Sequence, residues 1–277
     1  MKYHIHTLGC QMNAADSLRL ASGLEKLGAT KTEYIAEADI AVLNTCVVRQ
    51  SAEDRAYGWL HRVGALKRDT RPDLTVGLMG CLVGVKGNKK IANTFPDIDV
   101  FLPPSDPAPL LNLVEQQQFI QKSETDVVSR RHALQDGELI LPAADCGTTF
   151  ISYVPVVYGC SHACTFCIIP FRRGIERSRP VDQIVAECRS LAEQGVKEIT
   201  LLGQIVDRYG YDLPDRSNLA MLLERVHETP GLERIRFLTS HPNYLDDELL
   251  RIVAEMPKIC DHIEVPIQSG SNEVLEN

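Results

Sequence analysis

Three cysteines recur at nearly equal intervals near the start of the chain, each directly after a predicted strand. Cys10, Cys46 and Cys81 are 36 and 35 residues apart. The strands predicted before them, at residues 3–7, 39–43 and 74–79, alternate with segments of helical periodicity. This alternation predicts an open parallel α/β sheet. Because the carboxyl ends of parallel strands lie along one edge, we expect the three thiols to converge there rather than to be unrelated core cysteines.

The alternation covers residues 1–118, which we predict to form one domain. Helices are expected at residues 13–27, 51–66 and 107–117, and a fourth strand at 98–101. Between residues 119 and 148 the apolar periodicity fades, and Gln, Ser, Asp and Arg are frequent. This composition predicts an irregular linker.

A second domain is predicted at residues 149–277, where strands and helices alternate again. Strands are expected at 151–157, 198–202, 234–238 and 262–265, and helices at 181–194, 219–227 and 245–255. Four β/α units fit part of a β/α barrel, but four strands cannot close one and leave an open edge. We therefore expect an incomplete barrel in a truncated chain; the alternative is a complete protein with an unusual half-barrel.

A second trio of cysteines lies in one loop after the first strand of that domain. Cys160, Cys164 and Cys167 have the spacing C-x3-C-x2-C. Three thiolates are one fewer than a closed tetrahedral site needs, so a 4Fe–4S cluster held here keeps one iron open. The alternatives are a zinc site with His162 or a distant residue as fourth ligand, and an electron-transfer cluster, which normally has four cysteines. The other cysteines are interpreted as ordinary core or linker residues: Cys146, Cys188 and Cys260.

The amino-acid composition and charge exclude some classes of protein. The net charge is −8, from 37 acidic and 29 basic residues, which is not the balance of a nucleic-acid-binding chain. No stretch approaches the roughly 18 apolar residues of a membrane span, and no apolar targeting region opens the sequence. We expect a cytoplasmic protein without membrane contact, where thiols serve as metal ligands rather than in disulfides.

The amino-acid sequence around both trios resembles a known family. The C-x3-C-x2-C loop, with Phe166 before its last cysteine, resembles the signature of the radical S-adenosylmethionine (SAM) enzymes. The segments Gly9-Cys-Gln-Met-Asn, Asn44-Thr-Cys-Val-Val-Arg and Gly80-Cys resemble the N-terminal domain of the radical SAM methylthiotransferases. Within them, the chain is closest to the branch acting on tRNA, the 2-methylthio-N6-dimethylallyladenosine (isopentenyladenosine) synthases. Four further segments resemble the family's sequences: Cys167-Ile-Ile-Pro-Phe-Arg-Arg-Gly, Ser178-Arg-Pro, Leu201-Leu-Gly-Gln and Pro266-Ile-Gln-Ser-Gly-Ser.

The resemblance implies a SAM-dependent transferase with two 4Fe–4S clusters, each held by one trio. In that family SAM binds the open iron of the cluster at Cys160, Cys164 and Cys167 and is cleaved to a 5′-deoxyadenosyl radical. The radical removes hydrogen from carbon 2 of an isopentenylated adenosine beside the tRNA anticodon, where a methylthio group is then attached. The cofactors carry this chemistry and the protein positions them. The implied partners are the tRNA anticodon loop and an unidentified electron donor, and we expect a monomer.

Other residues are candidates for contacts with SAM or tRNA. Phe166 is expected near the SAM adenine, or is a hydrophobic plug. The predicted carboxyl ends of successive strands carry three candidates for hydrogen bonds to SAM: Gln204, Ser240 and Gln268. A basic run is expected to contact tRNA phosphates, or is a solvated loop: Arg172, Arg173, Arg177 and Arg179.

Two departures from the family pattern lie beside these positions. Ile205 stands where the family usually has Asn, and Glu264 where His is common. Both lie at predicted strand ends, where contacts with SAM or the substrate are expected. The alternative functions are methylthio transfer to threonylcarbamoyl-adenosine in tRNA or to a ribosomal protein, and a non-catalytic zinc or iron–sulfur protein.

Overall fold

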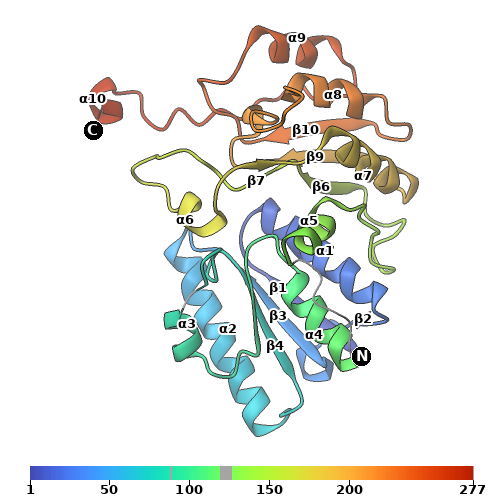
Figure 1. The fold of residues 1–277 in the computed structure, drawn as a ribbon, viewed down its shortest axis with the longest axis vertical. Coiled ribbons are helices and arrows are strands. Elements are labelled where there is room, and N and C mark those ends of the chain that lie inside the picture. Colours follow the sequence, from blue (N-terminus) through green and yellow to red (C-terminus); the bar gives the residue numbers. More distant parts are fainter. Residues whose placement is uncertain (88, 119–126, 277) are drawn as a thin grey trace. The chain divides into compact units, whose positions relative to one another are not determined.

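The computed structural model describes residues 1–87, 89–118 and 127–276. The chain forms two compact units. Unit 1 comprises Met1–Cys146 and Ser161–Ile175, and unit 2 comprises Gly147–Cys160 and Glu176–Asn277. Figure 1 shows the elements of both units. Among the described residues, no helix has the length and apolar character that crossing a membrane requires.

Unit 1 is built on a five-stranded parallel sheet. Its strand order is β2-β1-β3-β4-β5, formed by Thr30–Lys31, Lys2–Thr7, Ile40–Thr45, Thr75–Gly80 and Val100–Leu102. The helices α1 (Gln11–Lys26), α2 (Gln50–Asp69) and α3 (Lys89–Thr94) lie between these strands in the chain, and α4 (Ala108–Gln118) follows β5. A short 3-10 turn, η1 (Ile35–Glu37), precedes β3. The expected parallel α/β fold class is confirmed.

Helices cover both faces of this sheet. All six residues of β3 are buried, as expected for a central parallel strand. Successive side chains of a strand point to opposite faces, and Leu43 packs with Trp59 and Leu60 of α2. Val42 packs on the other face, with the apolar sides of α1 and α4. Burial of each such side chain contributes roughly 1.5–3 kcal/mol, and the two layers together hold the strand ends in fixed register.

The segment predicted as an irregular linker contains a helix, α5 (Val127–Asp136), and that prediction is corrected here. Residues 119–126 of it lie outside the described residues. Arg19 Nη1 donates hydrogen bonds to the carbonyls of Leu134 (3.3 Å) and Gly137 (2.7 Å), which pair the carboxyl end of α5 with a cation. Gln135 Nε2 donates to Ser105 O at 2.7 Å. Partners more than 25 residues away stabilise this helix, so local periodicity does not reveal it.

Unit 2 contains a three-stranded parallel sheet in the order β10-β9-β6, formed by Arg234–Leu238, Glu198–Leu202 and Ile151–Pro155. Its helices are α7 (Val181–Glu193), α8 (Leu219–His227), α9 (Asp247–Glu255) and α10 (Asn272–Glu276), with the 3-10 turn η2 (Val206–Arg208). The short strands β7 (Val157–Tyr158) and β8 (Arg177–Ser178) pair antiparallel. The barrel is not closed, as the sequence predicts.

Two helices of unit 2, α8 and α9, begin at capping side chains. Asn218 and Asp246 accept hydrogen bonds at 2.8 Å from the backbone N–H groups three residues later, at the starts of α8 and α9. Each cap satisfies a donor that has no partner within the helix. The Asp246 cap explains why α9 begins two residues after the predicted position.

The predicted strand at 262–265 is wrong. The chain beyond β10 makes one isolated parallel bridge, between Ile235 and Ile259, and the Ser240 N–H donates to Glu264 O at 3.0 Å. These contacts do not extend into a ladder, and His262 and Glu264 are exposed. Apolar alternation alone therefore overstated the pairing at this sheet edge.

Candidate metal centres

The three cysteines of the first trio follow adjacent strands of unit 1. Cys10 is the residue before α1, and Cys46 and Cys81 come directly after β3 and β4. The Cys81 N–H donates to Thr45 O at 3.0 Å. A Cβ placed on Gly9 lies 2.8 Å from the Cys46 Cβ. The structure thus brings the three positions together at the carboxyl edge of the sheet, and their role as cluster ligands stays a prediction.

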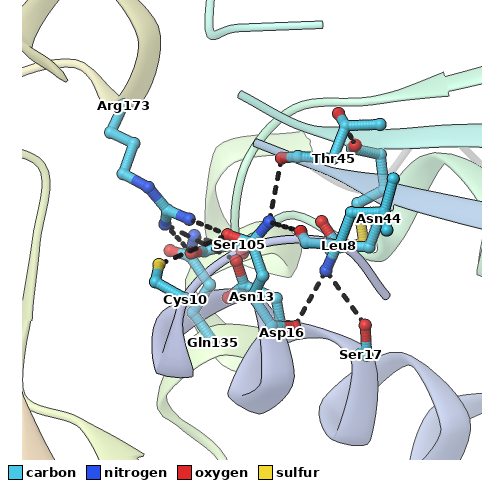
Figure 2. A network of polar contacts seen from close by, with 11 residues as sticks. Leu8, Cys10, Asn13, Asp16, Ser17, Asn44, Thr45, Ser105, Gln135 and Arg173 are labelled. Atoms are coloured by element: carbon cyan, nitrogen blue, oxygen red, sulfur yellow. Dashed lines mark hydrogen bonds and ion pairs between the residues drawn. The ribbon is translucent and has the colours of Figure 1, made fainter. Parts of the chain in front are cut away.

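A buried amide network fixes the loops that carry the trio (Figure 2). Asn13 Nδ2 donates to Leu8 O and to Thr45 O, both at 2.8 Å. Asn44 Nδ2 in turn donates to Asn13 O at 2.9 Å and to Ser17 Oγ at 3.0 Å. These bonds tie the loop after β1 to the loop after β3. Neither amide was predicted as a site residue, although each lies within three residues of a cysteine.

The surroundings of the trio fit an iron–sulfur cluster. All three thiols are free; Cys10 is exposed, and Cys46 and Cys81 are buried. Thiolates are the ligands that such clusters take in proteins. Within the described ranges, no group of three or more His, Cys, Asp or Glu residues is arranged to hold a metal ion. Cluster thiolates bind different iron atoms, so the ligands of a cluster do not converge on one point as those of a single ion do.

Burial and neighbouring charges shape the acidity of the trio. Burial raises the pKa of the Cys81 thiol, and the positive charge of Arg173 opposes that rise. Cys46 and Cys10 act on the same thiol and raise its pKa further. Metal binding deprotonates the three thiols, and the resulting thiolates repel one another. A nearby cation therefore stabilises the deprotonated trio.

Glycine is required just before Cys81. Gly80 has a φ of +97°, and a Cβ on it meets Thr45 O at 2.5 Å. We therefore expect Gly80→Ala to destabilise the chain by about 1–3 kcal/mol in urea denaturation. The control is Gly58→Ala within α2, where the added Cβ meets only Arg62 Nη1 at 3.8 Å and should stabilise by about 0.4–1 kcal/mol. Equal stability of the two variants contradicts the prediction.

The second trio lies on the loop that follows β7. Cys160 is buried at the end of one segment of unit 2, whereas Cys164 and Cys167 belong to the segment of unit 1 and are exposed and partly buried. The Cys167 N–H donates to Cys164 O at 3.0 Å, which closes a turn between these two. Phe166 within that turn is 71% exposed.

The SAM-contact candidates of unit 2 occupy different environments. Gln204 is partly buried just beyond β9, and Ser240 is buried two residues beyond β10. Both therefore lie at carboxyl ends of strands, as expected. Gln268 is exposed and follows no strand, which corrects its predicted placement.

The basic run splits into inward and outward side chains. Arg179 is completely buried, where its Nη2 lies 2.6 Å from Glu187 Oε2. Arg173 is also buried, in unit 1. Neither guanidinium is presented to a phosphate here, because each is taken up by partners inside its own unit. Arg172 and Arg177 remain partly exposed, with Arg177 5.1 Å from the centre of the Tyr158 ring.

Two family models match the chain, one over each set of cysteines. Residues 2–103 match the "Uncharacterized protein family UPF0004", and residues 154–277 match the "Radical SAM superfamily". The radical SAM match takes in somewhat less than half of the chain. This match covers all three cysteines of the C-x3-C-x2-C loop.

Curated relatives agree with the resemblance. A tRNA-2-methylthio-N(6)-dimethylallyladenosine synthase of Herpetosiphon aurantiacus is 43% identical over 276 residues, covering 99% of this chain and 59% of the relative. The synthase of the same name from Roseiflexus sp. is 44% identical over 276 residues, covering 99% of this chain and 55% of the relative. The chain thus spans somewhat more than half the length of these relatives. These relatives support the predicted resemblance to this branch of the radical SAM enzymes.

Solved structures support the fold. The radical SAM methyltransferase TsrM from Kitasatospora setae superposes with a TM-score of 0.65 at 14% identity, covering 99% of this chain and 62% of that one. The cobalamin-dependent SAM radical enzyme OxsB gives a TM-score of 0.60 at 14% identity, covering 99% and 45% of the two chains. At such low identity the likeness concerns the fold alone.

Proposed function

We propose that this chain is a radical SAM methylthiotransferase that adds a methylthio group to carbon 2 of isopentenylated adenosine next to the tRNA anticodon. One observation carries the proposal: synthases of that modification are 43% and 44% identical to the chain over 276 residues. Both cysteine trios fall within the matched length. The proposed substrate implies a cytoplasmic enzyme that meets the tRNA anticodon loop and an electron donor.

In this proposal the trios divide the work. Cys160, Cys164 and Cys167 would hold a 4Fe–4S cluster with an open iron for SAM, and the first trio would hold a second cluster. Bound SAM and cluster supply radical chemistry, which an aromatic C–H requires because it is too weak an acid for base catalysis. The buried amides around the first trio keep its loops in place, and Arg172 and Arg177 remain candidates for phosphate contact.

The test uses the chain reconstituted with iron and sulfide under anaerobic conditions. We expect about eight irons and eight sulfides per chain, since each cluster has four of each. SAM, a reductant and an isopentenylated anticodon stem–loop RNA are then added. Mass spectrometry should detect a methylthio group on the adenosine, together with 5′-deoxyadenosine.

Parallel reactions separate the alternative functions. One contains RNA with threonylcarbamoyl-adenosine and the other a ribosomal protein. Product on either of these alone contradicts the proposed substrate. Bound zinc without sulfide, or an iron-loaded chain that converts none of the three substrates, contradicts the proposed activity.

A further inference from the structure

A buried arginine reaches the first cysteine trio from outside the N-terminal sequence. Arg173 is the last residue of α6 (Ile169–Arg173), six residues after Cys167. Its side chain is only 3% exposed, and its charge acts on the Cys81 thiol. A buried guanidinium remains charged, so it brings a fixed positive charge to the trio.

The remaining contacts of Arg173 lie among polar groups of unit 1. Nη2 donates to Asn13 Oδ1 at 2.7 Å, and Nη1 donates to Ser105 Oγ at 3.3 Å. Nη1 also lies 3.5 Å from the buried carboxylate of Asp16. Figure 2 shows the guanidinium over Asn13 and Ser105, beside Cys10. Because these three partners surround the planar guanidinium, its orientation is fixed.

The backbone around Arg173 is held in the same place. The Val85 N–H, four residues after Cys81, donates to Arg172 O at 3.0 Å. A Cβ on Gly84 meets the Arg172 side chain at 3.5 Å, and one on Gly174 meets the Val85 side chain at 3.4 Å. The loop after Cys81 and the α6 segment are therefore packed against each other within unit 1.

The charges around the guanidinium are not balanced by Asp16 alone. Burial works to lower the pKa of Arg173, but Cys81, Asp16 and Cys10 together raise it above its ordinary value. For the Asp16 carboxyl, by contrast, burial raises the pKa, and the positive charge of Arg173 offsets that rise only in part. A buried cation with one poorly solvated acid beside it is stabilised by further negative charge, which three metal-bound thiolates provide.

We propose that Arg173 is a positioning residue that neutralises part of the negative charge of the cluster held by Cys10, Cys46 and Cys81 and thereby raises its reduction potential. The inference rests on the second cluster of the proposed function. Hydrogen bonds to cluster sulfurs and nearby charge are among the terms that set such potentials. A cation favours the reduced cluster, which carries one more negative charge.

The test isolates the first trio in a chain with Cys160, Cys164 and Cys167 changed to Ala. After reconstitution we expect about four irons per chain. Arg173→Met should make the one-electron reduction about tenfold less favourable, a shift of about 59 mV to lower potential, measured by a redox titration followed by electron paramagnetic resonance. Arg173→Lys, which keeps the charge, should restore most of the parent's reduction potential. The matched control is Arg172→Met on the same helix, whose potential should equal that of the parent.

A second variant works in the opposite direction and does not remove the arginine. Asp16→Asn deletes the competing negative charge, so the potential should rise. This variant decides the matter if Arg173→Met does not fold. Unchanged potentials in all folded variants that hold four irons overturn the inference and leave the second cluster standing. A triple-Ala parent that binds no iron overturns both.

Discussion

Changing Cys81 to Ala is expected to remove about half of the iron and to abolish methylthio transfer while 5′-deoxyadenosine is still formed. The proposed cluster has three protein ligands in the trio, and two thiolates are too few to hold a 4Fe–4S cluster. The C-x3-C-x2-C loop is untouched by the change, so cleavage of SAM should continue. Iron content falls from about eight to about four per chain, and the two products are measured together by mass spectrometry.

Two matched variants make this result specific. Cys164→Ala should also remove about four irons, but both products should disappear. Cys146→Ser changes a free, exposed cysteine outside both trios and should leave iron content and both products unchanged. Loss of 5′-deoxyadenosine in the Cys81 variant, or retention of its methylthio product, contradicts the division of work between the trios.

Much of the fold can be predicted from periodicity, because the deciding contacts are local or belong to the apolar pattern. The bounds of β9, α8 and β10 agree with the predicted ranges, and β3 is fully buried with an apolar run at Ile40–Leu43 as expected. Parallel topology then places residues that follow neighbouring strands at one edge, so Cys10, Cys46 and Cys81 could be grouped without coordinates.

The features that escaped prediction depend on partners distant in sequence. The helix α5 is stabilised by Arg19, more than 100 residues earlier. Sequence spacing also gave no indication of which arginines of the basic run point inward. Arg173 and Arg179 are buried because Asp16 and Glu187 lie opposite them, and neither acid stood out in the sequence. The basic run was thus interpreted as one surface feature, whereas two of its arginines are buried, one in each unit.

The Arg179–Glu187 pair is expected to dominate the stability of unit 2. Both side chains are fully buried, and Arg179 Nη1 also donates to Pro155 O at 2.7 Å. The Tyr209 hydroxyl donates to Arg179 O at 2.7 Å, so β6, α7 and the residue after η2 all contact this position. Removing one partner takes this counter-charge away from the other side chain, in a medium that solvates charge poorly. Glu187→Ala should therefore lower the free energy of unfolding by about 3–5 kcal/mol.

Urea denaturation of the parent, Glu187→Ala and the double variant Glu187→Leu/Arg179→Met measures this effect. Apolar side chains of similar volume need no counter-charge, so the double variant should recover most of the loss. Arg189→Ala, at an exposed position of the same helix, should change the free energy of unfolding by no more than about 0.5 kcal/mol. If Glu187→Ala were as stable as Arg189→Ala, the buried pair would not hold unit 2 together. If the double variant were no more stable than Glu187→Ala, the cost would come from lost packing rather than from the stranded arginine.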